Sequence, residues 1–152
     1  MAYATVNDPS AHFQALLYTG NSSTQSVTFD GNSNLQPDWV WTKCRSNTSD
    51  NFVFDSTRGV HKRIFTNTNA AEVTNTNALT SFDSDGFSMG NVGGMNFNSQ
   101  TYVGWGWKAN GGTTSTNSDG TVNVTIQVNS TAGFSIMKWN GNGNTSGTVG
   151  HG

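Results

Sequence analysis

The chain has 152 residues, enough for one ordinary domain, and its formal net charge of −2 gives no electrostatic attraction for nucleic acid. Only 33% of its residues are apolar and 11% are charged, but it contains five Trp, nine Phe and 18 Gly. Disordered chains are usually highly charged and poor in aromatic residues. The composition therefore predicts a folded domain of short strands and many turns, without a nucleic-acid partner.

Cys44 is the single cysteine, so no disulfide can form within the chain. No apolar run is long enough to cross a bilayer, and residues 1–5 lack the basic segment and apolar core of a secretory signal. We therefore expect a protein that is assembled in a cytoplasm, without membrane insertion, and that is stabilised by packing or by assembly.

Residues 1–12 are polar and precede the first alternating segment. Within them, Asp8 and Pro9 begin a turn or a short helix. Because the segment has no apolar pattern of its own, we expect it to be tied down by another chain rather than by its own domain. It is predicted to be a leader or attachment segment, with Tyr3, Asp8 and Pro9 as candidate attachment residues.

Period-two alternation predicts five strands in the first half of the chain. These strands span residues 13–19, 25–29, 39–43, 51–55 and 62–66. A hairpin with an Asp-Gly turn is expected to join residues 79–82 to 86–89. Three polar segments are predicted to be loops or linkers, at residues 66–77, 91–100 and 110–120. The only hint of helix is at residues 70–73.

The densest aromatic stretch is residues 102–108, in which two glycines alternate with two tryptophans. In a strand, Val103, Trp105 and Trp107 share one face and the glycines lie on the other. A helix would scatter the aromatic residues and be weakened by the glycines. We expect Trp105 and Trp107 to be core of a β-sandwich, because large aromatic residues dominate core burial. The alternative is a stacking platform for a sugar, with a glycine face that admits a ligand or another backbone.

The end of the chain resembles its beginning, since residues around Phe134 repeat those around Phe13 at a constant offset. Two further strands are predicted, at residues 121–128 and 134–139. We expect residues 113–152 to be the linker and start of a second repeat, outside the core of the first sandwich. Their apolar side chains would then pack against a neighbouring protomer or a continuation of the chain.

These elements predict an all-β protein without substantial helix. The expected organisation is a leader at 1–12, a β-sandwich domain at 13–112 and the second repeat from 113. The predicted structural core consists of aromatic residues from three strands: Trp39, Trp41, Phe52, Phe54, Trp105 and Trp107.

The residue types needed for hydrolysis are sparse. Glu72 is the only Glu, and Asp83 and Asp85 lie in a turn, where carboxylates satisfy local backbone donors. These two aspartates and Asn91 carry oxygens of the kind that bind calcium, but turn chemistry explains their spacing more simply. The three histidines, His12, His61 and His151, have no metal-ligand spacing. We expect no enzyme activity, no cofactor and no metal.

Five groups of residues together resemble a family of repeated domains in virion proteins of tailed phages, many from marine and cyanobacterial hosts. The groups are Asp8-Pro9-Ser10 with Phe13-Gln14 and Leu17-Tyr18-Thr19-Gly20; Leu35-Gln36-Pro37-Asp38-Trp39-Val40-Trp41 with Lys43 and Arg45; Phe54-Asp55-Ser56 with Arg58-Gly59; Ser81-Phe82 with Asp85-Gly86-Phe87 and Gly90; and Tyr102-Val103 with Trp105 and Trp107-Lys108-Ala109. The resemblance covers residues 8–112, and residues 129–152 as the start of a second repeat. It implies a concanavalin A-like (laminin-G-like) jelly-roll sandwich.

Two functions follow as expectations. The first is a virion structural protein of a tail fibre, spike or capsid-attached appendage, assembled in the host cytoplasm. Its partners would be other virion proteins and copies of itself, as a homotrimer, and it would mediate assembly and host attachment. The second is a lectin-like module that binds host-surface glycans through aromatic and amide side chains. The candidate glycan or partner contacts are Asn75, Asn77, Asn96, Asn98 and Trp139.

Overall fold

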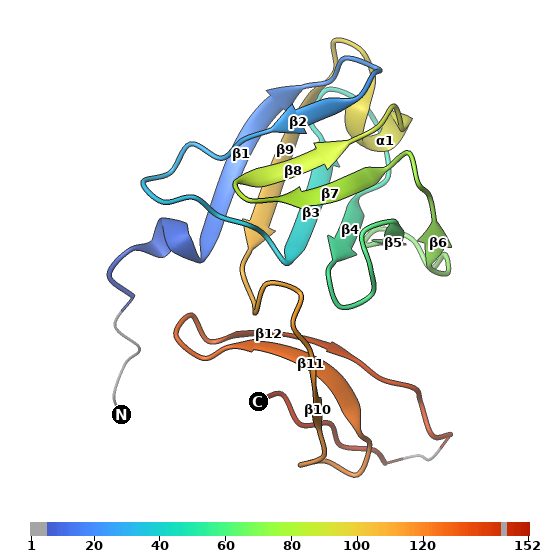
Figure 1. Cartoon of the computed structure of the whole chain (residues 1–152). Coiled ribbons are helices and arrows are strands. Elements are labelled where there is room, and N and C mark those ends of the chain that lie inside the picture. The colour runs from blue at the N-terminus through green and yellow to red at the C-terminus, as the bar shows by residue number, and fades with distance from the viewer. Residues whose placement is uncertain (1–5, 144–145) are drawn as a thin grey trace.

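The computed structural model describes residues 6–143 and 146–152, and it is nearly all β (Figure 1). Its helical elements are a 3-10 turn, η1 (Pro9–Ala11), and one turn of α-helix, α1 (Gly93–Asn96). The strands are β1 (Phe13–Thr19), β2 (Gln25–Val27), β3 (Trp39–Cys44), β4 (Phe52–Asp55), β5 (Lys62–Phe65), β6 (Val73–Thr74), β7 (Leu79–Asp83), β8 (Gly86–Met89), β9 (Thr101–Trp107), β10 (Ser115–Asn117), β11 (Val124–Asn129) and β12 (Phe134–Lys138). No helix in the described part of the chain is long and apolar enough to cross a membrane.

The prediction of an all-β sandwich is confirmed. A six-stranded sheet has the order β1-β9-β3-β4-β5-β6, and a three-stranded sheet, β2-β8-β7, packs in front of it in Figure 1. A third sheet, β10-β11-β12, lies below this pair near the end of β9. Every pair of neighbouring strands is antiparallel. The helix hinted at residues 70–73 is absent, because this stretch is extended and leads into β6. The jelly-roll topology stays a prediction.

The glycine face of β9 points into the sandwich. Tyr102 is completely buried there, and the space above Gly104 and Gly106 is filled by rings from the opposite layer. A Cβ on Gly106 would lie 2.5 Å from Cζ of Phe29, and one on Gly104 would lie 3.1 Å from Cζ of Phe87. Only glycine lets these rings approach the strand so closely. The small residues of β9 therefore make room for core aromatics, rather than for a ligand.

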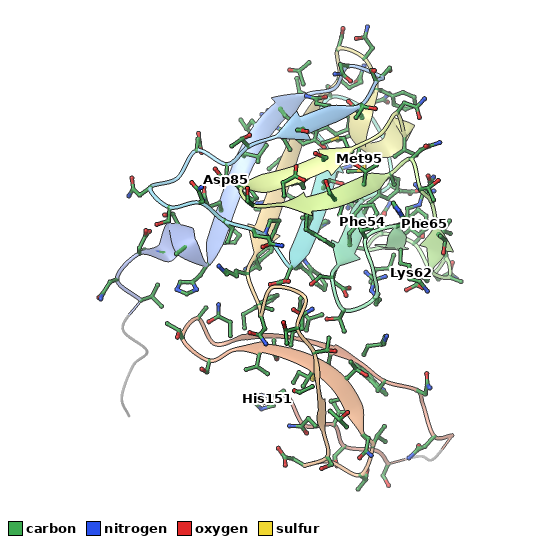
Figure 2. All side chains as sticks on the ribbon, in the orientation of Figure 1. Phe54, Lys62, Phe65, Asp85, Met95 and His151 are labelled. Carbon is green, nitrogen blue, oxygen red and sulfur yellow. The ribbon has the colours of Figure 1, made fainter. Side chains whose placement is uncertain are left out.

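The tryptophans of β3 and β9 consequently point outward, which corrects the predicted core. The four residues affected are Trp39, Trp41, Trp105 and Trp107, all half-buried on the outer face of the six-stranded sheet. Successive side chains of a strand alternate between faces, so burial of Tyr102 and the two glycines forces Trp105 and Trp107 outward. Phe52 and Phe54 are buried in the core, as predicted; Figure 2 labels Phe54 within the sandwich.

A buried polar cluster fastens the third sheet to the sandwich. The carboxylate of Asp38 accepts hydrogen bonds from the backbone N–H groups of residues 109, 111 and 112 at 2.8–2.9 Å, and from the Ser56 hydroxyl at 2.6 Å. The Gln127 amide on β11 donates to the hydroxyls of Ser56 and Thr57, both at 2.8 Å. Asp38 and Gln127 are each 1% exposed. The glycine-rich start of the predicted linker is thus a fixed loop.

The third sheet buries its own apolar side chains. Val124, Ile126 and Ile136 are at most 4% exposed within a single chain, and a Cβ on Gly152 would lie 2.6 Å from Cγ2 of Val128. For these three side chains, the expectation that burial needs a neighbouring protomer or a continuation of the chain is therefore wrong. The strands pair with one another and are covered by the last residues of the same chain. These side chains do lie outside the main core cluster of the sandwich.

The described part of the predicted leader packs on its own sandwich. The Asp8 carboxylate accepts hydrogen bonds from Ser10 and from the Ser33 hydroxyl, and Pro9 begins η1. The hydrogen bonds from Ser10 and then Ser33 lower the pKa of Asp8. The Asp8 carboxylate is thus satisfied within its own chain, and the contact of this segment with another chain stays a prediction. Tyr3 lies outside the described residues.

Two tyrosines stack on each other in the core. The rings of Tyr18 and Tyr102 lie 5.1 Å apart, and the Tyr18 hydroxyl donates to the carbonyl oxygen of Met95. Burial raises the pKa of Tyr18 well above its ordinary value, with smaller contributions from Tyr102 and Cys44. Burial also raises the pKa of Tyr102, and this effect outweighs the hydrogen bond from the Phe97 N–H, which lowers it.

We expect the free energy of unfolding to fall as the pH rises above about 10, the ordinary tyrosine pKa. Below that pH both states hold the phenol protons; above it the unfolded chain releases them first, so unfolding is favoured. Urea titrations between about pH 8 and pH 11.5 measure this, and Tyr18→Phe should reduce the slope. A stability independent of pH across this window would contradict the prediction.

Candidate interaction surface

The outer face of the six-stranded sheet carries a row of large apolar side chains. We call it the aromatic face. It comprises Phe13, Ala15 and Leu17 of β1, Val103, Trp105 and Trp107 of β9, and Trp39 and Trp41 of β3. The strand register places each β9 residue between one residue of β1 and one of β3. Trp105, for example, lies between Ala15 and Trp41.

Aromatic rings on this face are in contact with one another. Trp41 and Trp105 lie 5.0 Å apart between centroids, and Phe13 lies 4.6 Å from Trp107, both in tilted geometry. Phe134 of β12 stacks on Trp107 at 6.2 Å, so the third sheet covers one end of the aromatic face. Tilted and stacked rings at these separations attract one another beyond the effect of burial alone. The rings therefore pack against one another in two groups, Trp41 with Trp105, and Phe13 with Trp107 and Phe134.

The aromatic face is exposed along β1, most strongly at Leu17, which lies at the end away from Phe134. Leu17 is 65% exposed and Phe13 is 40% exposed, although both are large apolar residues. Lys43 follows the tryptophans on β3 and pairs with Val103, so a charge borders the face at this end. An apolar core with a charged rim is the composition of many protein interfaces.

An ionic network borders the face on its other side. Asp55, which pairs with Trp39, binds the Arg58 guanidinium, and Arg58 also binds Glu72 at 3.0 Å. Lys62 on β5 lies 3.3 Å from the same carboxylate. Burial raises the pKa of Glu72, but hydrogen bonds from Arg58 and Lys62 outweigh it and leave the pKa below its ordinary value. Asp55 is 2% exposed, so this pair anchors the turn after β4.

A polar cleft of about 600 Å³ lies at one end of the sandwich. It is lined by Lys43, Thr48, Ser49, Asp50, Phe52, Asn67 and Gly94. The Asn67 amide donates to Asp50 at 3.0 Å, and the Lys43 ammonium donates to the backbone oxygen of Ser49 at 3.2 Å. The Arg63 guanidinium lies 4.5 Å above the Phe52 ring, and burial lowers its pKa. The cleft thus combines an ammonium, a carboxylate and an amide in an open site.

Asn96 is a structural residue, which corrects its assignment as a glycan contact. It is completely buried at the end of α1. Its amide nitrogen donates to the backbone oxygens of Ser23 and Gly90 at 2.6 and 2.9 Å, and its oxygen accepts from the Asn21 N–H at 2.9 Å. A side chain whose donors and acceptor are used within the fold has no capacity left for a sugar.

The other candidate contacts lie on separate elements. The Asn75 side chain accepts the Asn77 N–H at 2.9 Å and so closes a turn before β7, whereas Asn77 itself is exposed. Asn98 is exposed after α1. Trp139 is 51% exposed and follows β12, in the third sheet. Trp139 follows a strand of the third sheet, whereas the three asparagines lie in loops of the sandwich, so these residues come from separate elements.

The acidic residues of the β7–β8 hairpin act within the fold. Asp83 accepts the hydroxyls of Ser81 and Ser88, and Asp85 accepts the backbone N–H of Leu35. Figure 2 shows His151 beside the lower sheet, far from Asp85 in the sandwich. Among residues 6–143 and 146–152, no group of three or more His, Cys, Asp or Glu is placed to hold a metal ion.

Sequence reasoning missed two parts of this surface. It did not single out Leu17, nor Asp50 and Asn67 in the cleft. Leu17 had a usable signal, since it shares a face with Phe13 on a strand whose other face carries Leu16 and Tyr18. The cleft had none, because its residues come from separate elements: strands β3 and β4, two loops and α1.

A family model described as a domain of unknown function (DUF7483) matches residues 8–152. No curated protein and no solved structure matches the chain.

Proposed function

We propose that this chain, which belongs to that family, is a structural protein of a tailed-phage virion, within a tail fibre, spike or capsid-attached appendage. In this proposal the sandwich is a rigid building block that binds copies of itself and other virion proteins. The motif resemblance in the sequence supports the virion context. One observation of the structure supports the role: the aromatic face carries large, uncharged side chains that point outward and pack against one another.

Exposure of this face favours assembly. Monomeric proteins rarely expose contiguous apolar patches larger than a few hundred Å², and larger patches mark interaction sites. Leu17 and Phe13 are 65% and 40% exposed beside two half-buried tryptophans. A protein in a crowded, permanent assembly covers such a face, and association is then driven mainly by the burial of apolar area.

The test is to locate the chain in particles. An antibody raised against residues 6–143 should label purified, intact virions of the phage that encodes it, and the chain should persist through density-gradient purification. The control is a non-structural protein of the same phage, which should be lost at the gradient step. Recovery of the chain only in the soluble fraction of the lysate would overturn the proposal.

A second candidate function, glycan binding, is favoured by the polar cleft. Lys43, Asp50 and Asn67 present the ammonium, carboxylate and amide groups that hydrogen-bond sugar hydroxyls, in an open site of about 600 Å³. It is compatible with the first function, because an appendage can attach to host polysaccharide.

If this second function holds, the purified chain should bind acidic or neutral host polysaccharide in isothermal titration calorimetry, and Asp50→Ala with Asn67→Ala should reduce affinity about tenfold or more. Asn98→Ala, which changes an exposed amide outside the cleft, is the matched control and should bind as wild type. Equal binding by the cleft variant would exclude the cleft as the site.

A further inference from the structure

The two edges of the six-stranded sheet differ in length and in chemistry. At one edge is β6, which has two residues and lies beside the charged groups of Arg58, Lys62 and Glu72. At the other is β1, with seven residues, FQALLYT, that include neither proline nor a charged residue. In the described part of the chain, no strand pairs with the far edge of β1.

Natural proteins protect an exposed sheet edge by keeping it short, or by placing Lys, Pro or a bulge on it. β6 is protected in this way, whereas β1 has none of these devices. Its register with β9 is continuous from Phe13 to Thr19, without a bulge. Its four outward residues, at positions 13, 15, 17 and 19, are all exposed. β1 is therefore an open edge that offers unpaired backbone groups and apolar side chains together.

The sequence of β1 is complementary to itself in an antiparallel register. When two copies pair about a two-fold axis at Leu16, Ala15 of one copy lies opposite Leu17 of the second, so a small residue meets a large one. The strand has no charged side chains, so this pairing brings no like charges together. Pairing of β1 with the two-residue β6 of another copy offers far fewer backbone bonds.

We propose that β1 pairs with β1 of a second copy, joining two six-stranded sheets into one continuous sheet and two aromatic faces into one surface. This inference rests on the proposed function, because it identifies a second copy of the chain as the partner that binds the six-stranded sheet. It specifies a two-fold dimer as the unit of assembly, in place of the trimer expected from the sequence. In an isologous contact of this kind each copy contributes the same patch.

The first test places a charge at the centre of the contact. Leu17→Lys changes a side chain that is 65% exposed in the single chain, so the fold should survive. The dimer should weaken about a hundredfold or more, because the contact loses two leucines, each opposite Ala15 of the other copy, and gains two lysines in diagonal positions across the two-fold axis. Val73→Lys, an exposed apolar residue of β6 at the other edge, is the matched control and should dimerise as wild type.

Sedimentation equilibrium between about 1 and 200 μM gives the mass. Wild type and Val73→Lys should approach twice the 16.2 kDa of the chain, and Leu17→Lys should stay at the mass of one chain. A wild-type monomer at 200 μM, a trimer, or a dimer unaffected by Leu17→Lys would overturn the inference. Circular dichroism confirms that each variant is folded.

The second test fixes the register. Ala15→Cys and Leu17→Cys chains, mixed and oxidised, should form a disulfide-linked dimer that neither chain forms alone, because residue 15 of one copy faces residue 17 of the other and neither residue faces itself. Native Cys44 is 1% exposed and remains in both chains as an internal control. Equal cross-linking in the separate chains would contradict the proposed register.

The two proposals fail in different ways. If the chain is found in virions but is monomeric or trimeric in solution, the β1 contact is wrong and the virion role stands. If it forms the β1 dimer but is absent from purified particles, the virion role is wrong and the dimer stands.

Discussion

Asp38→Ala should lower the free energy of unfolding by roughly 3–5 kcal/mol. The carboxylate holds three backbone N–H groups of the loop at residues 109–112 and the Ser56 hydroxyl. Removing it leaves the buried Ala109 N–H and two partly buried N–H groups without this acceptor, at about 1–3 kcal/mol for each orphaned group. Chemical denaturation followed by tryptophan fluorescence measures the loss.

The same variant should loosen the third sheet before the sandwich unfolds, because the loop held by Asp38 leads directly into β10. Limited proteolysis should therefore cut Asp38→Ala first near residues 110–120. Asp30→Ala removes an exposed aspartate from a loop and is the matched control, with an expected change within about 0.5 kcal/mol. Equal stability of the two variants would show that the buried cluster does not fasten the sheets.

Tyr102→Ala should cost about 3–5 kcal/mol, as large aromatic truncations in cores do. Tyr102 is completely buried, stacks on Tyr18, and its hydroxyl accepts the Phe97 N–H at 2.9 Å and donates to the backbone oxygen of Gly93 at 3.1 Å. Trp105→Ala, three residues along the same strand, should cost the isolated chain only about 1–2 kcal/mol, because the ring is half-buried.

This pair of variants tests which face of β9 is the core. Tryptophan is the larger residue, so side-chain size alone would give the opposite order. Urea denaturation of both variants, at concentrations low enough to keep the chain monomeric, gives the comparison. A greater loss for Trp105→Ala than for Tyr102→Ala would mean that the tryptophan face is covered within the single chain.

Period-two alternation located most of the strands, because it needs only local sequence. Residues 13–19 were predicted as a strand, and β1 has those bounds. The same alternation grouped Trp105 with Trp107 and the glycines with Tyr102. It does not say which group faces inward, because that depends on what the opposite layer supplies. Here Phe29 and Phe87 fill the space above the glycines, and neither is near β9 in sequence.

Local sequence patterns also did not predict how the third sheet is buried against the sandwich. The Asn110-Gly111-Gly112 segment has the composition of a flexible linker, yet Asp38, far away in sequence, binds two of its three backbone N–H groups directly. Gln127 completes this cluster from β11. A polar residue in a strand gives no local sign that it is buried. Long-range hydrogen bonds of this kind appear only once the chain is folded.

The free edge of β1 is the proposed contact between two copies, and hydrogen–deuterium exchange of its backbone amides tests this contact most directly. Alternate N–H groups between Phe13 and Thr19 point away from β9 and have no strand partner in the single chain. At about 1 μM these amides should exchange rapidly, and at about 200 μM they should slow at least about tenfold, while β6 is unchanged. Exchange of β1 that is independent of concentration, in a chain that sediments as an oligomer, would contradict the account.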